Sequence, residues 1–310
     1  MRVGLSWDVD ANDSPVESWA AILDEIVEGD RLGYDSAWMA ETREHAASCS
    51  SPSTFMTAAA ARTSSIQLRA SGVRVNHHHF VRLAEEVVIV DLFSRGRAGM
   101  AFASGSSCGL DPRRVHETID FMLTAWSTDE FRYRGHHVRF PAHTPDSAPE
   151  GPSEPERWDS YRPQWEWGPA TPDFLAITPK PFGTMPPVYV EIEDDETLEW
   201  AARHGVSPII GADMPTAAAI ERLRRYRSAA DAAGQRRSAV EPVIERRIEI
   251  DGPATSTALG GSPADLVLSL RNLKAQTAMA HLVWQRTPAQ RGRHDSLFQF
   301  ASAIQPLLQA

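Results

Sequence analysis

Only two cysteines, Cys49 and Cys108, occur in the 310 residues of the chain. Two are too few for a disulfide framework or a cysteine-rich metal site. No apolar stretch approaches the roughly 18 residues that a membrane span needs, and no run is rich in lysine and arginine. Because 41 acidic residues exceed 31 basic ones, the net charge of -10 disfavours binding to nucleic-acid phosphates. These absences predict a cytoplasmic protein with neither membrane nor nucleic-acid partners.

Apolar residues alternate between strand-like and helix-like spacing along most of the chain, and the first residues predict a strand rather than a signal peptide. Strands are predicted at residues 3–7, 34–40, 66–75, 97–103, 187–192, 208–210, 243–250 and 279–284. Helices are predicted at residues 15–32, 53–62, 80–93, 113–126, 194–204, 215–233, 263–274 and 294–308. Eight such pairs predict a single-domain α/β fold over residues 1–310, a (β/α)8 TIM barrel. The first strand has no Gly-x-Gly-x-x-Gly motif after it, which argues against an open dinucleotide-binding sheet.

An insertion around residues 128–175 interrupts this alternation. Its first part, up to residue 140, predicts a β-hairpin, whereas residues 141–173 are rich in Pro, Glu, Ser and Trp without periodicity. Such a run inside a barrel is typical of an active-site lid or mobile insertion, with a disordered surface loop as the alternative. Trp158, Trp165 and Trp167 are costly to leave in water, so we expect them to pack over an aromatic or otherwise large apolar substrate.

Barrel enzymes carry their reactive groups at the C-terminal ends of the strands. Candidates at the predicted strand ends are Trp7, Glu41, Thr42, His45, Gly72, Ala103, Ser104, Glu193, Asp194 and Thr197. Acids at the second and fifth strand ends could also supply the two carboxylates of a glycosidase, another common barrel enzyme. These acids are Glu41, Glu44, Glu193 and Asp194, and the sequence does not fix their separation.

Three consecutive histidines follow the third predicted strand. In an extended strand end His77 and His79 would share a face and His78 would not. No His-x-x-x-His or Cys-x-x-Cys pattern completes a ligand set, so we expect no metal site. The preferred interpretation is that His79 caps or packs against the start of the following helix.

Several segments resemble the bacterial luciferase-like, flavin-dependent monooxygenases. Residues 33–41 (GYDSAWMAE) resemble the family's second strand, where an acidic residue follows an aromatic one. Residues 79–86 (HFVRLAEE) resemble its His-Pro-x-Arg-x-Ala-Glu helix start. Residues 91–97 (DLFSRGR) match its Asp-x-x-Ser-x-Gly-Arg turn into the fourth strand, the most specific of these segments. The resemblance spans roughly residues 1–210 in consistent order.

The resemblance implies a two-component monooxygenase that oxidises a small organic molecule of the aromatic or natural-product type. A separate flavin reductase would supply reduced FMN transiently, and the barrel would hold it while dioxygen forms a C4a-(hydro)peroxide in a dry pocket. Glu41, Thr42 and His45 are then the expected catalytic residues. The expected flavin site comprises Trp7, Gly72, Ala103, Ser104, Glu193, Asp194 and Thr197. The family also implies a homodimer.

Some positions depart from the family pattern. Thr42 stands where the family often has a catalytic histidine, and His45 follows three residues later. Ala103 replaces the flavin-proximal cysteine of true luciferases, and Ser104 replaces the arginine that binds the flavin phosphate there. The helix after the fifth strand begins with Asp194 and further acids, where the family has small hydroxyl residues facing that phosphate.

These acids stabilise a helix N-terminus but repel a phosphate dianion. One like-charge pair at ~4 Å costs about 4 kcal/mol at a surface-like dielectric, which weakens binding by ~1000-fold. An arginine such as Arg43, Arg74 or Arg114 would have to compensate.

Two alternatives to the FMN-dependent monooxygenase therefore stay open. In the first, the barrel has lost its flavin and is a cofactor-free enzyme or a ligand-binding protein, with His45, Glu41 and Glu193 available for acid–base work. In the second, it is an F420-dependent oxidoreductase. The phosphate objection also applies to F420, and the sequence shows no basic cluster for the polyglutamate tail of that cofactor.

Overall fold

The computed structural model describes residues 1–10, 12–43, 48–106, 109–140, 176–236 and 240–309. Its strands are β1 (Arg2–Trp7), β2 (Ser36–Ala40), β3 (Gln67–Val73), β4 (Ala98–Phe102), β5 (Tyr133–Arg134), β6 (Arg139–Phe140), β7 (Val188–Glu191), β8 (Ser207–Ile210), β9 (Val243–Ile250), β10 (Ala258–Gly261) and β11 (His281–Arg286). Its α-helices are α1 (Pro15–Leu32), α2 (Pro52–Ala60), α3 (Phe80–Ser94), α4 (Pro112–Ser127), α5 (Asp195–His204), α6 (Thr216–Ala232), α7 (Pro263–Thr277), α8 (His294–Gln299) and α9 (Gln305–Gln309).

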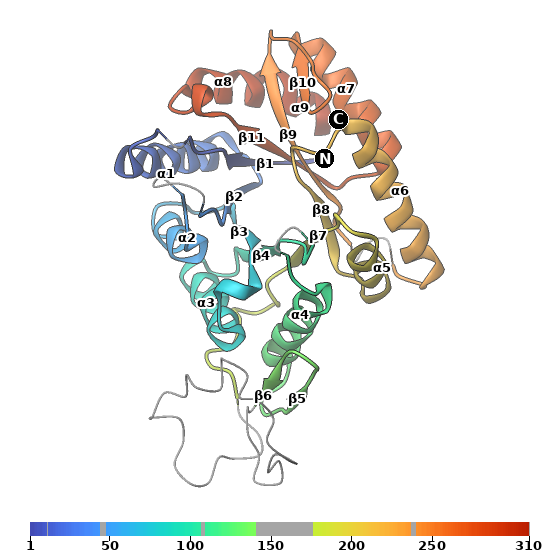
Figure 1. Ribbon diagram of the computed structural model, residues 1–310. Helices are drawn as coiled ribbons and strands as arrows, with labels where there is room; N and C mark the ends of the chain where they lie inside the picture. Colours follow the sequence, from blue (N-terminus) through green and yellow to red (C-terminus); the bar gives the residue numbers. More distant parts are fainter. Residues whose placement is uncertain (11, 44–47, 107–108, 141–175, 237–239, 310) are drawn as a thin grey trace.

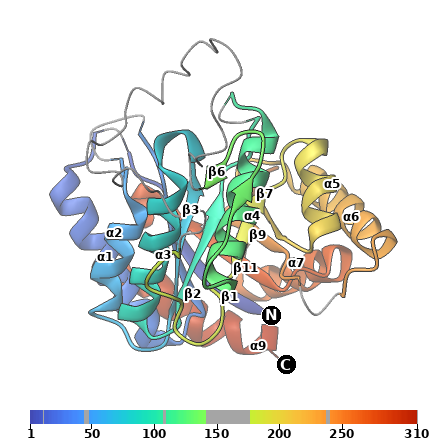
Figure 2. The same cartoon turned by 90° about the horizontal axis from the view of Figure 1, so that it is seen from below.

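Eight parallel strands in the described part of the chain form a closed barrel. The ring runs β1, β2, β3, β4, β7, β8, β9 and β11, and β11 pairs with β1 to close it. The helices that connect successive strands surround the ring on its outside (Figures 1 and 2). The predicted (β/α)8 barrel is confirmed.

Helix α1 shows how the sequence sets a helix and its end. Pro15 occupies the first turn, where a missing N–H costs nothing, and Gly33 ends the helix with a φ of 80° that favours glycine. Ile22 and Ile26 lie one turn apart and are fully buried against the barrel. The apolar spacing therefore places the helix on the outer face of the strands.

The inside of the ring is filled by side chains from six of its strands. A separate buried cluster comprises Trp38, Ala101, Tyr189, Ile209, Val243 and Val283. The rings of Trp38 and Tyr189 lie 5.1 Å apart, although β2 and β7 are not neighbours in the sheet. These residues therefore meet across the interior and form a packed plug rather than a pore.

A buried ion pair ties the two ends of the chain together where the ring closes. Arg286 at the end of β11 donates to Glu25 of α1 at 2.7 Å, and both side chains are fully buried. The indole N–H of Trp7, at the end of β1, donates to the same carboxylate at 2.6 Å. One acid in a helix therefore fixes the C-terminal ends of two adjoining strands.

The insertion is described only at its beginning. β5 and β6 pair antiparallel, which confirms the predicted hairpin. The predicted lid at 141–173, with Trp158, Trp165 and Trp167, lies outside the described residues.

Two elements differ from the sequence-based expectation. Strand β10 was not expected; it pairs with β9 from Arg247 onwards, beyond Ile244, where the pairing of β9 with β8 ends. The single terminal helix expected at 294–308 is interrupted by a π-helical segment, Phe300–Ile304, between α8 and α9. No helix in the described ranges is long and apolar enough to cross a membrane.

Candidate functional site

A layer of inward-facing residues lies at the C-terminal mouth of the barrel, one step above the plug. Each member follows a plug residue or its in-register neighbour by two positions, and alternate residues of a strand face the same side. We call this the mouth layer: Ser6, Ala40, Ala103, Glu191, Glu245 and Gln285. Three of these side chains are small and three are polar.

Glu191 and Glu245 are acids in the interior of this mouth. Protein atoms surround both, but each side chain keeps some contact with solvent. Burial, together with the neighbouring charges of Glu193 and Glu245, raises the pKa of Glu191 to about 8. Burial also raises the pKa of Glu245, although Ser6 donates a hydrogen bond to it. Glu191 is therefore a neutral carboxylic acid at pH 7, able to donate a proton or a hydrogen bond.

Glu41 is a carboxylate hub on the rim of the mouth, just after β2. It accepts hydrogen bonds from Arg43 Nε at 2.9 Å and from the backbone N–H of Arg74 at 3.0 Å. His77 Nδ1 and His78 Nε2 lie 2.9 and 2.8 Å from its two oxygens. Burial opposes its charge, but the bonds from His78, the Arg74 N–H and His77 outweigh burial and lower the pKa of Glu41 to about 2.

The two adjacent histidines share one partner because the chain is not extended where they lie. Val75–His77 forms a single 3-10 turn, so the alternation expected of a strand end does not apply. His77 and His78 therefore converge on Glu41, while His79 precedes α3 and stacks on Phe80 with ring centroids 4.6 Å apart. The side chain of His79 makes no capping hydrogen bond, so the packing part of its interpretation holds and the capping part does not.

The other candidates near the second strand are distributed as follows. Gly72 lies beside Glu41 with a φ of 58°, at an irregularity in the pairing of β3 with β4. Thr42 and Cys49 exchange hydrogen bonds of 3.0 Å that close the intervening loop. His45 lies outside the described residues. Trp7 is buried and bonded to Glu25, away from Glu41.

Asp194 occupies the N-terminus of α5, the corner where the resemblance places the flavin phosphate. Its Oδ1 accepts the backbone N–H of Thr197 at 2.7 Å, and its Oδ2 accepts the Thr197 hydroxyl at 2.9 Å. Ser106 and Ser104 donate to the same Oδ2 at 3.1 and 3.2 Å. The structure thus brings Ser104, Asp194 and Thr197 together, with the protein's own carboxylate as the anion of the corner.

Two arginines of α6 bind the acid that follows Asp194. Arg222 and Arg225 both pair with Asp195, and Arg222 also donates to the backbone carbonyl of Glu193, whose side chain is exposed. His116 lies behind Thr197, with its Nε2 3.3 Å from the hydroxyl, and stacks on Trp200. Burial lowers the pKa of His116 to about 4, so it is neutral at pH 7. The ionised carboxylate of Asp194 therefore disfavours a flavin phosphate in this corner.

The ring part of a flavin meets a different environment in the mouth. Within the part of the chain that the structure describes, buried Oε1 of Gln285 and buried Oδ1 of Asn76 have no hydrogen-bond partner. Unpaired buried acceptors call for a donor from outside the chain, and the N–H groups of an isoalloxazine ring are such donors. Together with neutral Glu191 and the small Ala40 and Ala103, these acceptors suit a planar polar ring.

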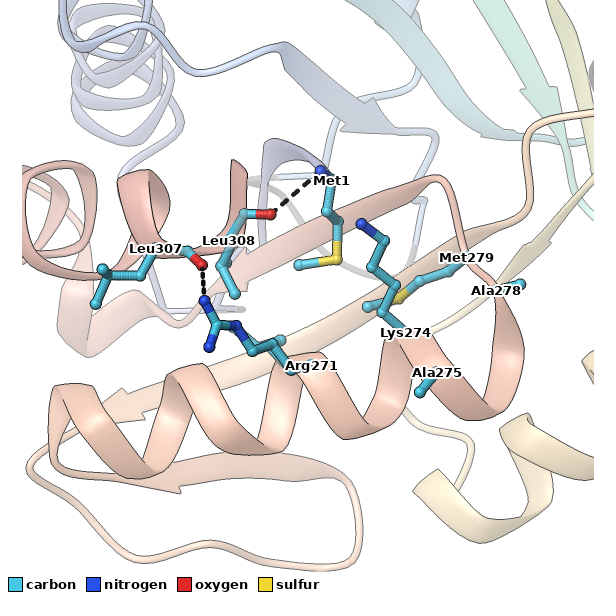
Figure 3. A pocket seen from close by; sticks show the side chains of 9 residues that line it. Met1, Arg271, Lys274, Ala275, Ala278, Met279, Leu307 and Leu308 are labelled. Carbon is cyan, nitrogen blue, oxygen red and sulfur yellow. Dashed lines mark hydrogen bonds between the residues drawn. The ribbon is translucent and has the colours of Figure 1, made fainter. Parts of the chain in front are cut away.

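A separate cavity of about 420 Å³ lies at the opposite end of the barrel (Figure 3). Met1 and Met279 line it just before β1 and β11 begin, and Arg271 beside them donates to the backbone carbonyl of Leu307 at 2.7 Å. Because barrel enzymes react at the C-terminal face, this N-terminal cavity belongs to the stabilising end of the fold.

Sequence reasoning selected Glu41 but missed its two histidine partners and the mouth acids. Glu191 lies near the end of the strand predicted at residues 187–192, and a charged residue two positions after a buried tyrosine on one strand is the signal that could have marked it. The partnership of Glu41 with His77 and His78 depended on a local turn that apolar spacing does not predict.

Comparison with known proteins places this architecture in a family. A family model described as luciferase-like monooxygenase matches residues 1–258. The chain belongs to this family. As a luciferase-like barrel, it is placed among oxidoreductases.

Two curated relatives match part of this luciferase-like chain. Limonene 1,2-monooxygenase of Rhodococcus erythropolis is 36% identical over 110 residues, which cover 31% of this chain and 28% of the relative. 4-Hydroxyprotoasukamycin monooxygenase of Streptomyces nodosus subsp. asukaensis is 32% identical over 114 residues, which cover 33% of this chain and 30% of the relative. The chain thus matches less than a third of the length of either protein.

Solved structures of the same fold match almost the whole luciferase-like chain. Monooxygenase RslO1 of Streptomyces bottropensis superposes with a TM-score of 0.75 at 18% identity, covering 99% of both chains. The oxygenating constituent of 3,6-diketocamphane monooxygenase of Pseudomonas putida, in complex with FMN, gives 0.73 at 15% identity, covering 99% of this chain and 98% of that one. F420-dependent tetrahydromethanopterin reductase of Methanopyrus kandleri gives 0.71 at 13%, covering 99% of both. At these identities the likeness shows the fold alone.

Proposed function

We propose that this luciferase-like protein is a flavin-dependent monooxygenase that oxidises a small organic molecule with dioxygen at the mouth of its barrel. The family match over residues 1–258 carries the proposal. The mouth layer supports it, because Gln285 and Glu191 offer an acceptor and a donor to a flavin ring. When bound, a reduced flavin would supply the electrons, and a separate reductase would deliver it in transient contact.

The chain's own residues then provide proton transfer and orientation. Glu41 stays ionised and holds the imidazoles of His77 and His78, as carboxylates orient histidines in other acid–base sites. Glu191, neutral at pH 7, offers a proton from the floor of the mouth. Two acids of one residue type, with pKa values pushed in opposite directions, suit complementary acid and base roles.

The substrate class follows from the relatives as a proposal. Both curated relatives are named monooxygenases, one of limonene, so we propose a small, largely apolar substrate such as a terpene or a natural-product ring. The predicted lid tryptophans would cover it.

A homodimer is proposed as the assembly. Ile89 and Phe93 of α3 and Phe182 beside it are exposed apolar side chains, with 40%, 67% and 51% of their surface accessible. Phe182 lies next to Gly96, just beyond the end of α3, so these side chains belong to one side of the barrel. A partner subunit would cover them.

Oxygen transfer is tested with isotopically labelled dioxygen. Chemically reduced flavin, the protein and limonene are mixed with labelled dioxygen, and products are analysed by mass spectrometry. The proposal predicts protein-dependent products that carry the label. Label found only in hydrogen peroxide and water, across a panel of terpenes and aromatic compounds, contradicts it.

One observation favours a second candidate, a barrel that uses no flavin. Asp194 fills the corner where the family resemblance places the phosphate, and F420 would meet the same carboxylate through its phosphodiester. A cofactor-free enzyme would use Glu41 with His77 and His78 alone. Titration of the protein with flavins separates the two, because the second candidate predicts no saturable binding of any flavin.

A further inference from the structure

We infer that the barrel selects a flavin that lacks the 5′-phosphate, of the riboflavin type, over FMN. This inference rests on the proposed function, because it names the form of flavin that the same mouth accepts. Four hydrogen bonds to one carboxylate carry it: those from the Thr197 N–H, the Thr197 hydroxyl, Ser104 and Ser106 to Asp194.

Two residues that contact each other differ in charge from the family pattern. Ser104 stands where the family resemblance places a phosphate-binding arginine, and Asp194 stands where it places a small hydroxyl residue. Their side chains lie 3.2 Å apart and are hydrogen-bonded. The pair has thus lost one positive charge and gained one negative charge, and the two changes fit each other.

The ionisation state of Asp194 follows from its hydrogen bonds. Burial opposes ionisation, but the hydrogen bonds from Thr197, Ser106 and Ser104 outweigh it and lower the pKa of Asp194 below its ordinary value. The carboxylate is therefore charged at neutral pH. It uses the helix N-terminus and the hydroxyl groups that would otherwise bind a phosphate.

Two arginines near the start of α5 are paired with an acid other than Asp194. Asp195, the next acid along the chain, is paired with Arg222 and Arg225, which takes both arginines. Neutral His116 adds no positive charge behind Thr197. A phosphate dianion at ~4 Å from an uncompensated carboxylate binds up to ~1000-fold more weakly, and salt and water reduce that factor.

A flavin tail that ends in a hydroxyl group can bind Asp194. Among the described residues, the Oδ1 of Asp194 accepts a hydrogen bond from the Thr197 N–H alone, and a carboxylate oxygen has two lone pairs. The terminal hydroxyl of riboflavin can donate to the free lone pair, whereas a phosphate dianion has no proton to donate. The corner therefore favours a neutral hydroxyl and disfavours an anion.

The test is a fluorescence titration of the full-length protein with riboflavin and, separately, with FMN. We expect riboflavin to bind at least about tenfold more tightly than FMN at low salt, with a smaller ratio at high salt because screening weakens the repulsion. FMN binding as tightly as riboflavin, or more tightly, overturns the inference and leaves the proposed function standing. If neither flavin binds, both fall together.

Two variants test whether Asp194 causes the selectivity for riboflavin over FMN. Asp194→Asn removes the charge but keeps a side chain able to cap α5, and we expect it to bring the two affinities within about threefold. The double variant S104R/D194S should reverse the preference in favour of FMN. Circular dichroism checks that both are folded. Selectivity that is unchanged in Asp194→Asn, with the fold intact, contradicts the assignment to this carboxylate.

Discussion

Two glutamates of the site are treated in opposite ways by their surroundings. Glu41 meets two histidines, an arginine and a backbone N–H, so its pKa falls to about 2. Glu191 meets other acids and little solvent, so its pKa rises to about 8. The same side chain is thus an anion on the rim of the mouth and a neutral acid on its floor. Local hydrogen-bond donors decide which form is present at neutral pH.

Glu191 is expected to make stability depend on pH. In the unfolded chain it ionises near the ordinary glutamate pKa of 4.5, but in the folded protein burial raises its pKa to about 8. The folded state therefore binds more protons between these values, and stability falls as pH rises through that window. Glu191→Gln should remove this loss and be more stable than wild type at pH 8 by on the order of 4 kcal/mol.

Urea unfolding of both proteins from pH 4 to pH 8 provides the check. The curves should nearly coincide near pH 4, where Glu191 is protonated in both states, and separate as pH rises. Parallel curves across the whole range would show that Glu191 is ionised in the folded protein.

Glu41 is a positioning residue, because it acts through His77 and His78. Glu41→Gln should lower kcat for labelled-product formation by roughly 100-fold, the size of a lost acid–base contribution, with little change in KM. Glu221→Gln, at an exposed position on α6, is the matched control and should leave both constants unchanged. A change confined to KM would assign Glu41 to binding instead.

Residue positions were predictable from the sequence where they follow strand ends, and less so where they depend on partners. Glu41 and Asp194 were found because each follows a recognisable apolar strand. The convergence of His77 and His78 was not, because it needs a tight turn after β3. Nor was the raised pKa of Glu191, which depends on its burial and on the charges of Glu193 and of Glu245 from β9.

At the scale of elements, apolar periodicity located the ring strands and their helices to within a few residues. β10 was missed because four residues that end in Gly260 and Gly261 lack the branched or aromatic pattern of a strand. Helix α5 matters most for function, because Asp194 is its N-cap and also occupies the corner where the family resemblance places the flavin phosphate.

Asp194 is the N-cap of α5, and its loss should be measurable as stability. Asp194→Ala removes the bond from the Thr197 N–H and should cost about 1 kcal/mol in the free energy of unfolding. Asp194→Asn, which keeps a capping oxygen, should cost less than half as much. Chemical denaturation of the two variants distinguishes them, and equal losses would mean that charge rather than capping matters at this helix end.

At the scale of the whole molecule, the barrel depends on closure between β1 and β11. Glu25 receives Arg286 and Trp7 in a fully buried site, so removing its charge leaves an arginine buried without its anion. Glu25→Gln should lower the free energy of unfolding by about 3 kcal/mol. Glu28→Gln, one turn along α1 and paired with the exposed Arg31, should change it by less than about 1 kcal/mol.

Comparing the two variants shows how much the buried ion pair contributes to the stability of the closed barrel. Thermal unfolding followed by far-ultraviolet circular dichroism reports both variants under one buffer condition. Similar midpoints for Glu25→Gln and Glu28→Gln would show that the buried pair contributes no more than a surface one.

The whole barrel presents a mouth that suits a flavin ring beside a corner that already holds an anion. The most direct measurement is a crystal structure of the protein grown with riboflavin. We predict the isoalloxazine ring on the mouth layer, near Gln285 and Glu191, with Asp194 still bonded to the Thr197 N–H. A mouth that stays empty at saturating riboflavin, or a ring bound elsewhere on the molecule, would contradict the account.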